Sequence, residues 1–335
     1  MRSILYITNR FGYTGGQETV VAELARAFSG IIQTHILCQH ANAVPPQNVI
    51  LHTGIKALLQ FAFTKQRFDI IHLHHPLHIF TLICAIAIRS RFKIATFHAR
   101  HYSPNPFKRF ILKAYVYSAI NLLPFVTDKF VFLSKFAEKE WKSKIFLGRP
   151  STIIPNGLAL SGSPRPKRTT PIKNGLFVGV LRESKGIYLL LEAAKARPDL
   201  AFTVVGRGNL KGEAPGNVIL IGEESRNEVQ KYYKSADFLV FPSSSEQCPL
   251  VLIVALAYGL PIICSACCGL NEMIEDNING YSMKNLSSQE ILNGIRFLSD
   301  NMERYNDISA NNTIKYQAEY SMQMFVKRHQ IIYGC

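Results

Sequence analysis

Residues 246–261 of the chain read Glu246-Gln-Cys-Pro-Leu-Val-Leu-Ile-Val-Ala-Leu-Ala-Tyr-Gly-Leu-Pro261. An acidic residue and Pro249 precede an apolar run, and a Gly-x-Pro sequence closes it, which predicts a short buried helix. The first backbone N–H groups of a helix lack intrahelical partners and carry a partial positive charge. With a carboxylate beside them, these groups are suited to bind a phosphate and a sugar hydroxyl together.

Short apolar runs alternate with helical patterns on both sides of this stretch, which predicts an α/β fold with parallel sheets. One helix is expected from about Gln17 to Phe28 and another over residues 186–196. The last 23 residues are expected to form a further helix. Its apolar side would carry Tyr316, Tyr320, Met324 and Phe325. Strands are expected at residues 4–8, 34–38, 70–73, 93–97, 129–133 and 152–154, and then at 175–180, 201–205, 218–221, 238–241 and 261–264.

The length of 335 residues and the composition indicate two domains. Residues 161–174 are Pro-rich, basic and without periodicity, which predicts a linker. The expected domains are therefore residues 1–165 and 166–312, followed by a C-terminal helix over 313–335 that crosses back to the first domain.

The positive charge of the chain is concentrated in its first half. The net charge is +15, and residues 1–165 hold 20 Lys and Arg against 6 Asp and Glu, which is +14. This asymmetry suggests that the two domains have different partners, and nucleic acid, an anionic membrane surface or a phosphorylated acceptor would each suit the basic half. Nucleic acid is disfavoured, because most of the motifs described below lie in the neutral half.

Membrane-spanning and metal-binding classes are disfavoured by the sequence. No apolar run reaches the roughly 18 residues of a membrane span, and the start turns polar too early for a signal peptide, so a cytoplasmic location is expected. The seven cysteines are odd in number and read as reduced thiols, and Cys264-x-x-Cys267 lacks a second ligand pair. No Cys, Asp or Glu joins His72, His74, His75 and His78 at ligand spacing, so no metal site is expected.

Four further motifs and one single histidine lie beside the predicted strands and helices. Gly15 and Gly16 precede the first helix, where glycine permits close approach of the backbone to an anion. His98 follows the strand at 93–97, at the strand end where open α/β sheets bind ligands. Residues 155–157 read Pro-Asn-Gly, residues 179–186 read Gly-Val-Leu-Arg-Glu-Ser-Lys-Gly, and residues 268–272 read Cys-Gly-Leu-Asn-Glu.

This ordered set of motifs resembles the retaining family-4 glycosyltransferases, also described as glycosyl transferases group 1. The resemblance extends from Gly15 to about Tyr333 and implies a GT-B architecture, two Rossmann-like domains facing each other across a cleft. It implies that Glu246 bonds a hydroxyl of the donor sugar, that Lys185 holds the diphosphate, and that His98 lies near the transferred sugar. Glu246 and His98 are the candidate catalytic residues. The candidate donor-binding residues are Gly15, Gly16, Arg182, Lys185, Cys248, Pro249, Leu250, Gly269 and Leu270.

The implied activity is metal-independent, retaining transfer, without a cofactor, of a hexosyl group from a nucleotide-diphosphate sugar. UDP-sugars are the expected donors, and a glycan or lipid-linked acceptor of bacterial surface-polysaccharide or lipopolysaccharide assembly is expected. Three positions depart from the family. Val254 stands where a second Glu is usual, Val180 where an arginine is usual, and Ala159 where an Asp is usual. These departures leave two alternatives, a non-catalytic glycosyltransferase-like binding subunit and a nucleotide-sugar epimerase of GT-B fold.

Residues 107–126 combine aromatic, aliphatic and basic residues without an acid. Lys108, Arg109 and Lys113 fall along one side of the predicted helix, as on helices that lie in a membrane interface. The alternative is an ordinary packed helix with solvated lysines. These three residues are the candidate membrane or acceptor surface, which would place the protein on the inner face of the cytoplasmic membrane.

Overall fold

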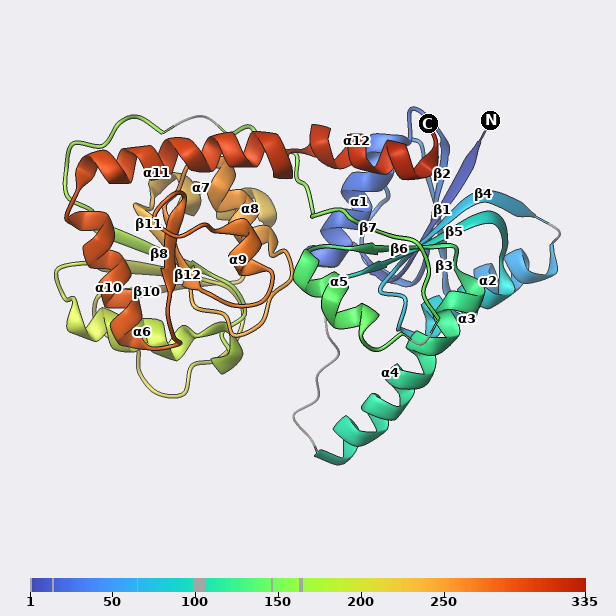
Figure 1. Cartoon of the computed structure of the whole chain (residues 1–335), viewed down its shortest axis with the longest axis horizontal. Helices are drawn as coiled ribbons and strands as arrows, with labels where there is room; N and C mark the ends of the chain where they lie inside the picture. The colour runs from blue at the N-terminus through green and yellow to red at the C-terminus, as the bar shows by residue number, and fades with distance from the viewer. Residues whose placement is uncertain (1, 14, 65, 99–105, 146, 163–164) are drawn as a thin grey trace. The chain divides into compact units, whose positions relative to one another are not determined.

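The computed structural model describes residues 2–13, 15–64, 66–98, 106–145, 147–162 and 165–335, without the side chains of residues 106–111 and 113. The chain forms two compact units (Figure 1). The N-terminal unit comprises Met1–Asn156 together with Phe325–Cys335, and the C-terminal unit comprises Gly157–Met324. Each unit contains a parallel sheet with helices, which confirms the α/β class. The boundary between the units follows Asn156, whereas the sequence placed it near residue 165.

The sheet of the N-terminal unit has the strand order β3-β2-β1-β4-β5-β6-β7, and every neighbouring pair is parallel. The order reverses direction between β1 and β4, as in doubly wound nucleotide-binding folds. The strands are β1 (Ser3–Phe11), β2 (Gln33–Ala41), β3 (Val49–Thr53), β4 (Arg67–His74), β5 (Arg89–Phe97), β6 (Lys129–Phe132) and β7 (Ser151–Ile153).

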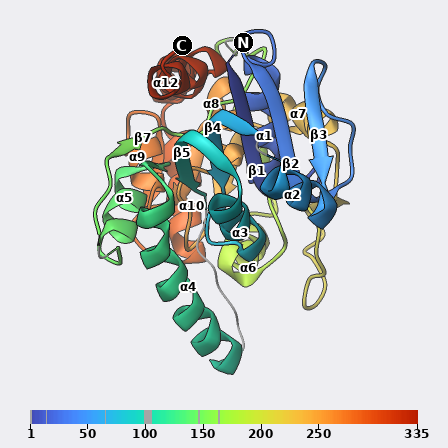
Figure 2. The ribbon, with the colours of Figure 1, turned by 90° about the vertical axis from the view of Figure 1, so that its right-hand side faces the viewer.

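Helices pack on both the early and the later strands of this unit. The predicted apolar face of α1 is confirmed, because Val20, Val21, Leu24, Ala25 and Phe28 are all buried. Another core cluster joins the inward sides of α2, α3, α4 and α5 to the strands, and Figure 2 shows α2, α3 and α4 on the same side of the sheet. The helices are α1 (Gly16–Phe28), α2 (Gly54–Phe63), α3 (Ile79–Ala87), α4 (Pro106–Val126) and α5 (Lys135–Lys142).

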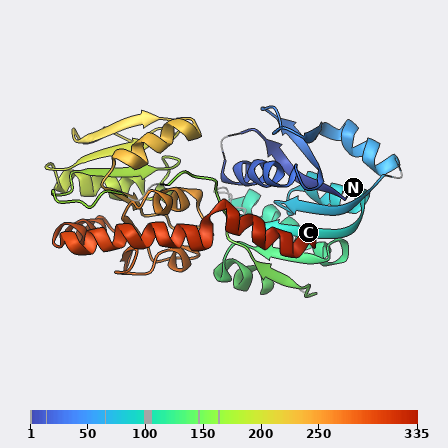
Figure 3. The same ribbon diagram turned by 90° about the horizontal axis from the view of Figure 1, so that it is seen from above.

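The C-terminal residues complete the N-terminal unit. The ring of Tyr333, near the end of α12 (Met322–Tyr333), packs edge-on against Phe28 of α1 with centroids 5.0 Å apart. The guanidinium of Arg2 donates a hydrogen bond to the carbonyl of Gly334, and Figure 3 shows the two chain ends in this unit.

The sheet of the C-terminal unit has the order β10-β9-β8-β11-β12-β13, again parallel throughout. Its direction reverses between β8 and β11. The strands are β8 (Asn174–Val178), β9 (Ala201–Val205), β10 (Val218–Gly222), β11 (Phe238–Phe241), β12 (Ile262–Ser265) and β13 (Gly280–Met283). The helices are α6 (Ile187–Ala196), α7 (Arg226–Ser235), α8 (Leu250–Ala257), α9 (Leu270–Met273), α10 (Ser288–Ser299) and α11 (Met302–Lys315), with a 3₁₀ turn η1 (Glu183–Lys185) and a π-helical turn η2 (Tyr316–Tyr320).

The single helix predicted for the last 23 residues is wrong, because the chain breaks at Ser321. Its ψ of 152° is extended, and the break separates η2 from α12. The backbone of Leu158 fills the break, since its N–H bonds the carbonyl of Tyr320 and its carbonyl accepts from the N–H of Met322. The hydroxyl of Tyr316 also donates to the carbonyl of Leu158 at 2.9 Å.

The described part of the predicted linker, residues 161–162 and 165–173, forms no helix or strand, and it is anchored to the C-terminal unit. The guanidinium of Arg165 donates to the carbonyls of Tyr258 and Ala236 at 2.8 and 2.7 Å. Arg168 pairs with the buried carboxylate of Asp237. Across the described residues, every helix is too short or too polar to cross a lipid bilayer.

Candidate functional site

The strand order of each unit indicates where a ligand binds. In open parallel sheets, ligands occupy the crevice at the carboxyl ends of the strands, where the strand order reverses. In the C-terminal unit these are the ends of β8 and β11, and in the N-terminal unit the ends of β1 and β4. The sequence-predicted residues Lys185, Glu246 and His98 lie in segments that follow strands β8, β11 and β5.

The loop after β8 is pressed against the segment that follows β11. Gly186 has a φ of +74°, and a Cβ at this position would lie 2.3 Å from the carbonyl oxygen of Pro242. The N–H of Ser244 donates to the carbonyl of Ser184 at 2.9 Å. Position 186 requires a positive φ and leaves no room for a Cβ atom, and only glycine meets both requirements. The absence of a side chain there lets the two segments approach each other.

This close approach brings Lys185 and Glu246 together. Their ammonium and carboxylate groups form an ion pair, and the same carboxylate oxygen lies 3.0 Å from the hydroxyl of Ser243. The Lys185 side chain is 30% exposed and that of Glu246 is 14% exposed. A cation and an anion are therefore held at the strand ends while both remain accessible to a ligand.

The segments after β12 and before α8 close around the same place. The N–H of Gly269 donates to the carbonyl of Glu246 at 2.9 Å, and a Cβ at Gly269 would lie 1.8 Å from the carbonyl oxygen of Gln247. The thiol of Cys267 lies 3.3 Å from the carbonyl oxygen of Ser243, which also accepts from the hydroxyl of Ser265. Three strand ends thus meet in one polar cluster around Glu246.

The helix predicted from residues 246–261 is confirmed as α8. It follows Pro249, and Gly259 adopts a φ of +58° before Pro261, as the Gly-x-Pro sequence predicted. The N–H groups of Leu250 and Val251 lie in its first turn, where no carbonyl precedes them within the helix. Because Glu246 lies only four residues before this turn, these N–H groups are at the end of the helix nearest to Glu246 in the chain.

Some predicted donor residues can reach a ligand only through their backbone. Cys248 is buried, and Leu270, the first residue of the four-residue helix α9, is fully buried. Arg182 precedes η1 with its side chain exposed, and among the described residues it forms no ion pair with the Lys185–Glu246 cluster. The structure therefore groups Lys185, Glu246 and Gly269 closely and leaves Arg182 at the edge.

In the N-terminal unit, His98 forms a hydrogen bond with His74. The Nδ1 atom of His74 lies 2.8 Å from Nε2 of His98, and the two rings stack with centroids 5.1 Å apart. His74 is the last residue of β4, and its Nε2 is buried without a hydrogen-bond partner in the described part of the chain. His98 directly follows β5 and is mostly buried.

A second layer of imidazoles lies beneath this pair. The Nδ1 atom of His72 lies 2.6 Å from the hydroxyl of Tyr333, and its Nε2 lies 2.6 Å from the hydroxyl of Thr96. His329 of α12 donates through Nδ1 to the carbonyl of Phe325 at 2.9 Å. These histidines are thus held by hydroxyl, carbonyl and imidazole groups. Among the described residues, no three His, Cys, Asp or Glu side chains are placed to hold a metal ion.

Burial keeps these imidazoles neutral. It is the main cause that lowers the pKa of His98 to about 3 and that of His329 to about 4. The pKa values of His72 and His74 are also well below the usual range, because burial disfavours the charged ring and neighbouring histidines oppose a second charge. His98 therefore acts as a neutral donor or acceptor of hydrogen bonds at pH 7.

Gly15 and Gly16 lie where predicted, at the start of α1. The carbonyl of Gly15 accepts from the N–H of Thr19 at 3.1 Å, and the Gln17 amide donates to the hydroxyl of Thr8 in β1 at 3.1 Å. The helix start is thereby tied to the first strand. The side chains of Lys108, Arg109 and Lys113 belong to α4 but lie outside the described residues.

Two polar groups of the site were missed by the sequence reasoning. Ser243 bonds Glu246 and follows β11 at once, so its position at a strand end was the available signal. His74 was grouped with the other histidines of its segment, although it also ends a strand.

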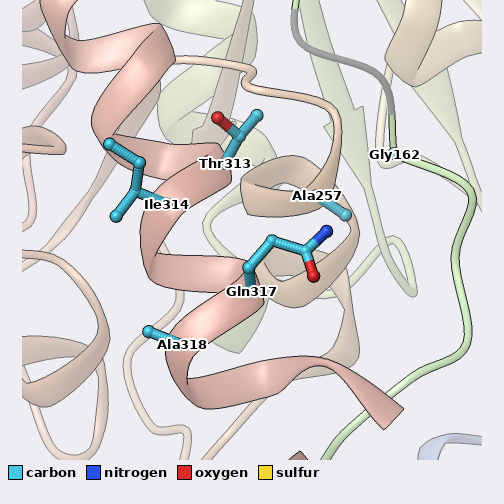
Figure 4. Close-up of a pocket in the computed structure, with 6 residues that line it drawn as sticks. All are labelled: Gly162, Ala257, Thr313, Ile314, Gln317 and Ala318. Atoms are coloured by element: carbon cyan, nitrogen blue, oxygen red, sulfur yellow. The ribbon is translucent and has the colours of Figure 1, made fainter. Parts of the chain in front are cut away.

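The C-terminal unit also contains a pocket of about 520 Å³ that is separate from this cluster. It lies between the end of α8, the last turns of α11 and η2 (Figure 4). It is lined by Gly162, Ala257, Thr313, Ile314, Gln317 and Ala318, mostly through apolar atoms. None of the predicted site residues lines it.

Comparison with known families covers both units. Residues 170–315 match the family described as Glycosyl transferases group 1, and residues 14–161 match the one described as Glycosyltransferase Family 4. An uncharacterized glycosyltransferase of Haemophilus influenzae is 32% identical over 204 residues, which cover 54% of each chain. The putative teichuronic acid biosynthesis glycosyltransferase TuaC of Bacillus subtilis is 32% identical over 186 residues, covering 52% of this chain and 45% of TuaC. These matches thus span about half the length of the two curated relatives.

Among solved structures, HepE of Anabaena in complex with UDP and glucose has a TM-score of 0.80 and 15% identity, with all of both chains covered. At this identity, the similarity establishes the GT-B fold alone.

Proposed function

Because the chain belongs to the family-4 glycosyltransferases of GT-B fold, we propose that it transfers a glycosyl group from a nucleotide-diphosphate sugar to a glycan or lipid-linked acceptor. The proposed donor is a UDP-hexose, and the proposed product retains the configuration of the sugar. UDP is favoured because the structurally similar HepE was crystallised with UDP and glucose.

The observation that carries this proposal is the Lys185–Glu246 ion pair at the carboxyl ends of β8 and β11. A nucleotide-sugar presents negative charge on its diphosphate and hydroxyl groups on its sugar. Lys185 would bind the diphosphate, and Glu246 would accept a hydrogen bond from a sugar hydroxyl. The diphosphate would thus replace Glu246 as the partner of Lys185, and the sugar would replace Lys185 as the partner of Glu246. The N–H groups at the start of α8 would add neutral donors beside the phosphate.

The proposed reaction needs no protein nucleophile. The acceptor oxygen attacks the anomeric carbon as the bond from that carbon to the diphosphate breaks, and the acceptor proton passes to the leaving phosphate. Lys185, with Arg182 at the edge of the site, would stabilise the charge that develops on the nucleoside diphosphate, the work that Mg²⁺ does in metal-dependent transferases. His98, as a neutral imidazole, would bond the transferred sugar.

The proposed acceptor belongs to bacterial surface polysaccharide or lipopolysaccharide and binds the basic N-terminal unit. The relative TuaC carries a name from teichuronic acid biosynthesis, which supports a polysaccharide product. The charge of +14 over residues 1–165 favours an acceptor that carries phosphate, as lipid-linked glycans do.

Titration calorimetry with UDP, GDP, dTDP and ADP tests the donor site first. We expect UDP to bind in the micromolar range and Lys185→Ala to weaken that binding, with Lys195→Ala on the exposed side of α6 as the control. Retained binding after addition of EDTA is expected, because no metal takes part. If none of the four nucleotides binds, the proposal is wrong.

A second step tests transfer itself. Purified protein is incubated with UDP-sugars and lipid-linked acceptors, and release of UDP is compared with formation of glycosylated lipid. Donor binding without transfer to any acceptor would favour the non-catalytic subunit. An altered sugar nucleotide formed without acceptor would favour the epimerase.

A further inference from the structure

Helix α3 exposes an entirely apolar face. Its sequence is Ile-Phe-Thr-Leu-Ile-Cys-Ala-Ile-Ala, and its inward side buries Phe80, Cys84 and Ala85. Ile79 and Ile83 remain about half exposed on the outward side. Ile86 completes this stripe, seven residues after Ile79. A surface helix of a globular protein normally places polar residues there, so this side of α3 is unusual for a face that meets only water.

The two helices beside α3 also expose apolar side chains. Helix α3 contacts both α2 and α4, and the three helices lie on the same side of the sheet (Figure 2). Phe63 of α2 is 83% exposed and Phe125 of α4 is 70% exposed. We call the following set the apolar face: Ile55, Leu59 and Phe63 of α2, Ile79, Ile83 and Ile86 of α3, and Tyr117, Leu122 and Phe125 of α4.

The segment that carries the apolar face is strongly basic. Residues 54–126 contain ten Lys and Arg and a single acidic residue, Asp69. Lys56 is exposed between Ile55 and Leu59 on α2, and Arg89, the first residue of β5, is also exposed. The exposed cations Lys56 and Arg89 are therefore close in the chain to exposed apolar side chains, which suits a partner that is apolar inside and anionic at its boundary.

We propose that the apolar face binds the surface of an anionic lipid bilayer. Its Ile and Phe side chains enter the boundary between headgroups and acyl chains, while the surrounding Lys and Arg contact lipid phosphates. A second copy of the chain fits this surface less well, since two such segments would bring like charges together. The inference extends the proposed function, because it rests on a lipid-linked acceptor for its purpose, and it adds α2 and α3 to the surface expected from α4 alone.

Vesicle flotation tests this surface with the full-length protein and no donor or acceptor present. We expect binding to phosphatidylethanolamine vesicles that contain about 30% phosphatidylglycerol, and much weaker binding to phosphatidylcholine alone. The double variant Phe63→Ser/Ile83→Gln is expected to lower binding about tenfold or more, because both side chains lose their apolar contact. Val44→Gln, which changes an 88% exposed residue in the loop between β2 and β3, is the matched control and is expected to bind as wild type.

Three results would overturn the proposal. Wild type could fail to bind anionic vesicles, or the double variant could bind them as wild type does. Light scattering could also reveal a dimer that the double variant converts to monomer, which would assign the face to a second copy. UDP calorimetry on the same preparations separates this outcome from failure of the proposed function, since the double variant leaves Lys185 and Glu246 untouched.

Discussion

Nδ1 of His74 and Nε2 of His98 lie 2.8 Å apart, and the other ring nitrogen of His74 is buried without a hydrogen-bond partner among the described residues. A buried lone pair without a partner is tolerated better than a buried N–H without one. We therefore infer that His74 carries its proton on Nδ1 and donates to His98. His98 then carries its own proton on Nδ1 and can donate it.

This tautomer of His98 leads to a prediction for His74. His74→Phe removes the hydrogen bond that fixes the His98 proton, and we expect kcat of the proposed transfer to fall by up to about tenfold, with UDP affinity unchanged. Kinetics together with calorimetry measure the two effects separately, and imidazole ¹⁵N shifts report the tautomer. His40→Ala, at an exposed position of β2, is the control. Unchanged kinetics and shifts in His74→Phe would contradict the assignment.

Substitutions of Lys185 and of Glu246 are expected to have different effects on UDP binding. Lys185→Ala is expected to weaken UDP binding about tenfold to a hundredfold, because a charge-assisted bond to phosphate is lost. Glu246→Gln is expected to leave UDP binding nearly unchanged and to reduce transfer, since its proposed partner is the sugar. Calorimetry with UDP and with the UDP-sugar distinguishes them. Equal loss of UDP affinity in both variants would indicate that Glu246 binds the nucleotide and not the sugar.

Val254 of α8 predicts a gain of affinity on substitution. The resemblance to the family implies a second Glu at this position, and Val254→Glu is expected to tighten UDP binding about tenfold to a hundredfold by supplying a charge-assisted bond to the ribose. Calorimetry measures the change, and Val254→Met serves as a control without a carboxylate. If both variants bind alike, the ribose is bound elsewhere.

Position 269 is expected to tolerate only a residue without a side chain. A Cβ there would lie 1.8 Å from the carbonyl oxygen of Gln247, so Gly269→Ala is expected to destabilise the protein by about 1–3 kcal/mol. Gly216→Ala, where a Cβ meets no atom within 4 Å, is the matched control. Urea unfolding of both variants gives the comparison, and equal stability would show that the loop yields without cost.

The buried histidines predict that the protein loses stability in mild acid. Their pKa values are lowered in the folded state, to about 3 for His98 and about 4 for His329, while unfolding restores the ordinary value of 6.5. The unfolded chain then binds more protons between these values, so stability falls as pH drops from about 6.5 to about 4. Urea midpoints at about pH 7.5 and pH 5.5 measure the slope, and His329→Gln should make it shallower. An equal slope in the variant would show that His329 does not contribute to the loss of stability in acid.

Elements with local periodicity were predicted from the sequence, while elements set by distant contacts were not. The buried side of α1 and the bounds of β9 follow from patterns within a few residues. Strands β3 and β13 were not predicted. Strand β3 lies at a sheet edge, where pairing on one side only leaves a weak hydrophobic pattern in the sequence, and β13 is short and partly polar. The break at Ser321 depends on Leu158, more than 160 positions away in the sequence.

The same division holds for the site. Lys185 and Glu246 were predicted because they match motifs of the family that the sequence resembles, and His98 was predicted because it matches the family and also follows a strand directly. The contact of His74 with His98 depends on the register of β4 against β5, in which His74 lies opposite Thr96. No pattern within either segment carries that register. The apolar face likewise depends on which sides of α2, α3 and α4 the sheet leaves uncovered.

The return of Phe325–Cys335 to the N-terminal unit affects how the protein is made on the ribosome. Phe28 and His72 contact Tyr333, yet all of Gly157–Met324 must be translated between them. At ordinary elongation rates this delay lasts roughly 10–30 s. Throughout that time the nascent N-terminal unit exposes surface that only the last helix covers, whereas the C-terminal unit is continuous in sequence. The unit translated first is thus the one completed last.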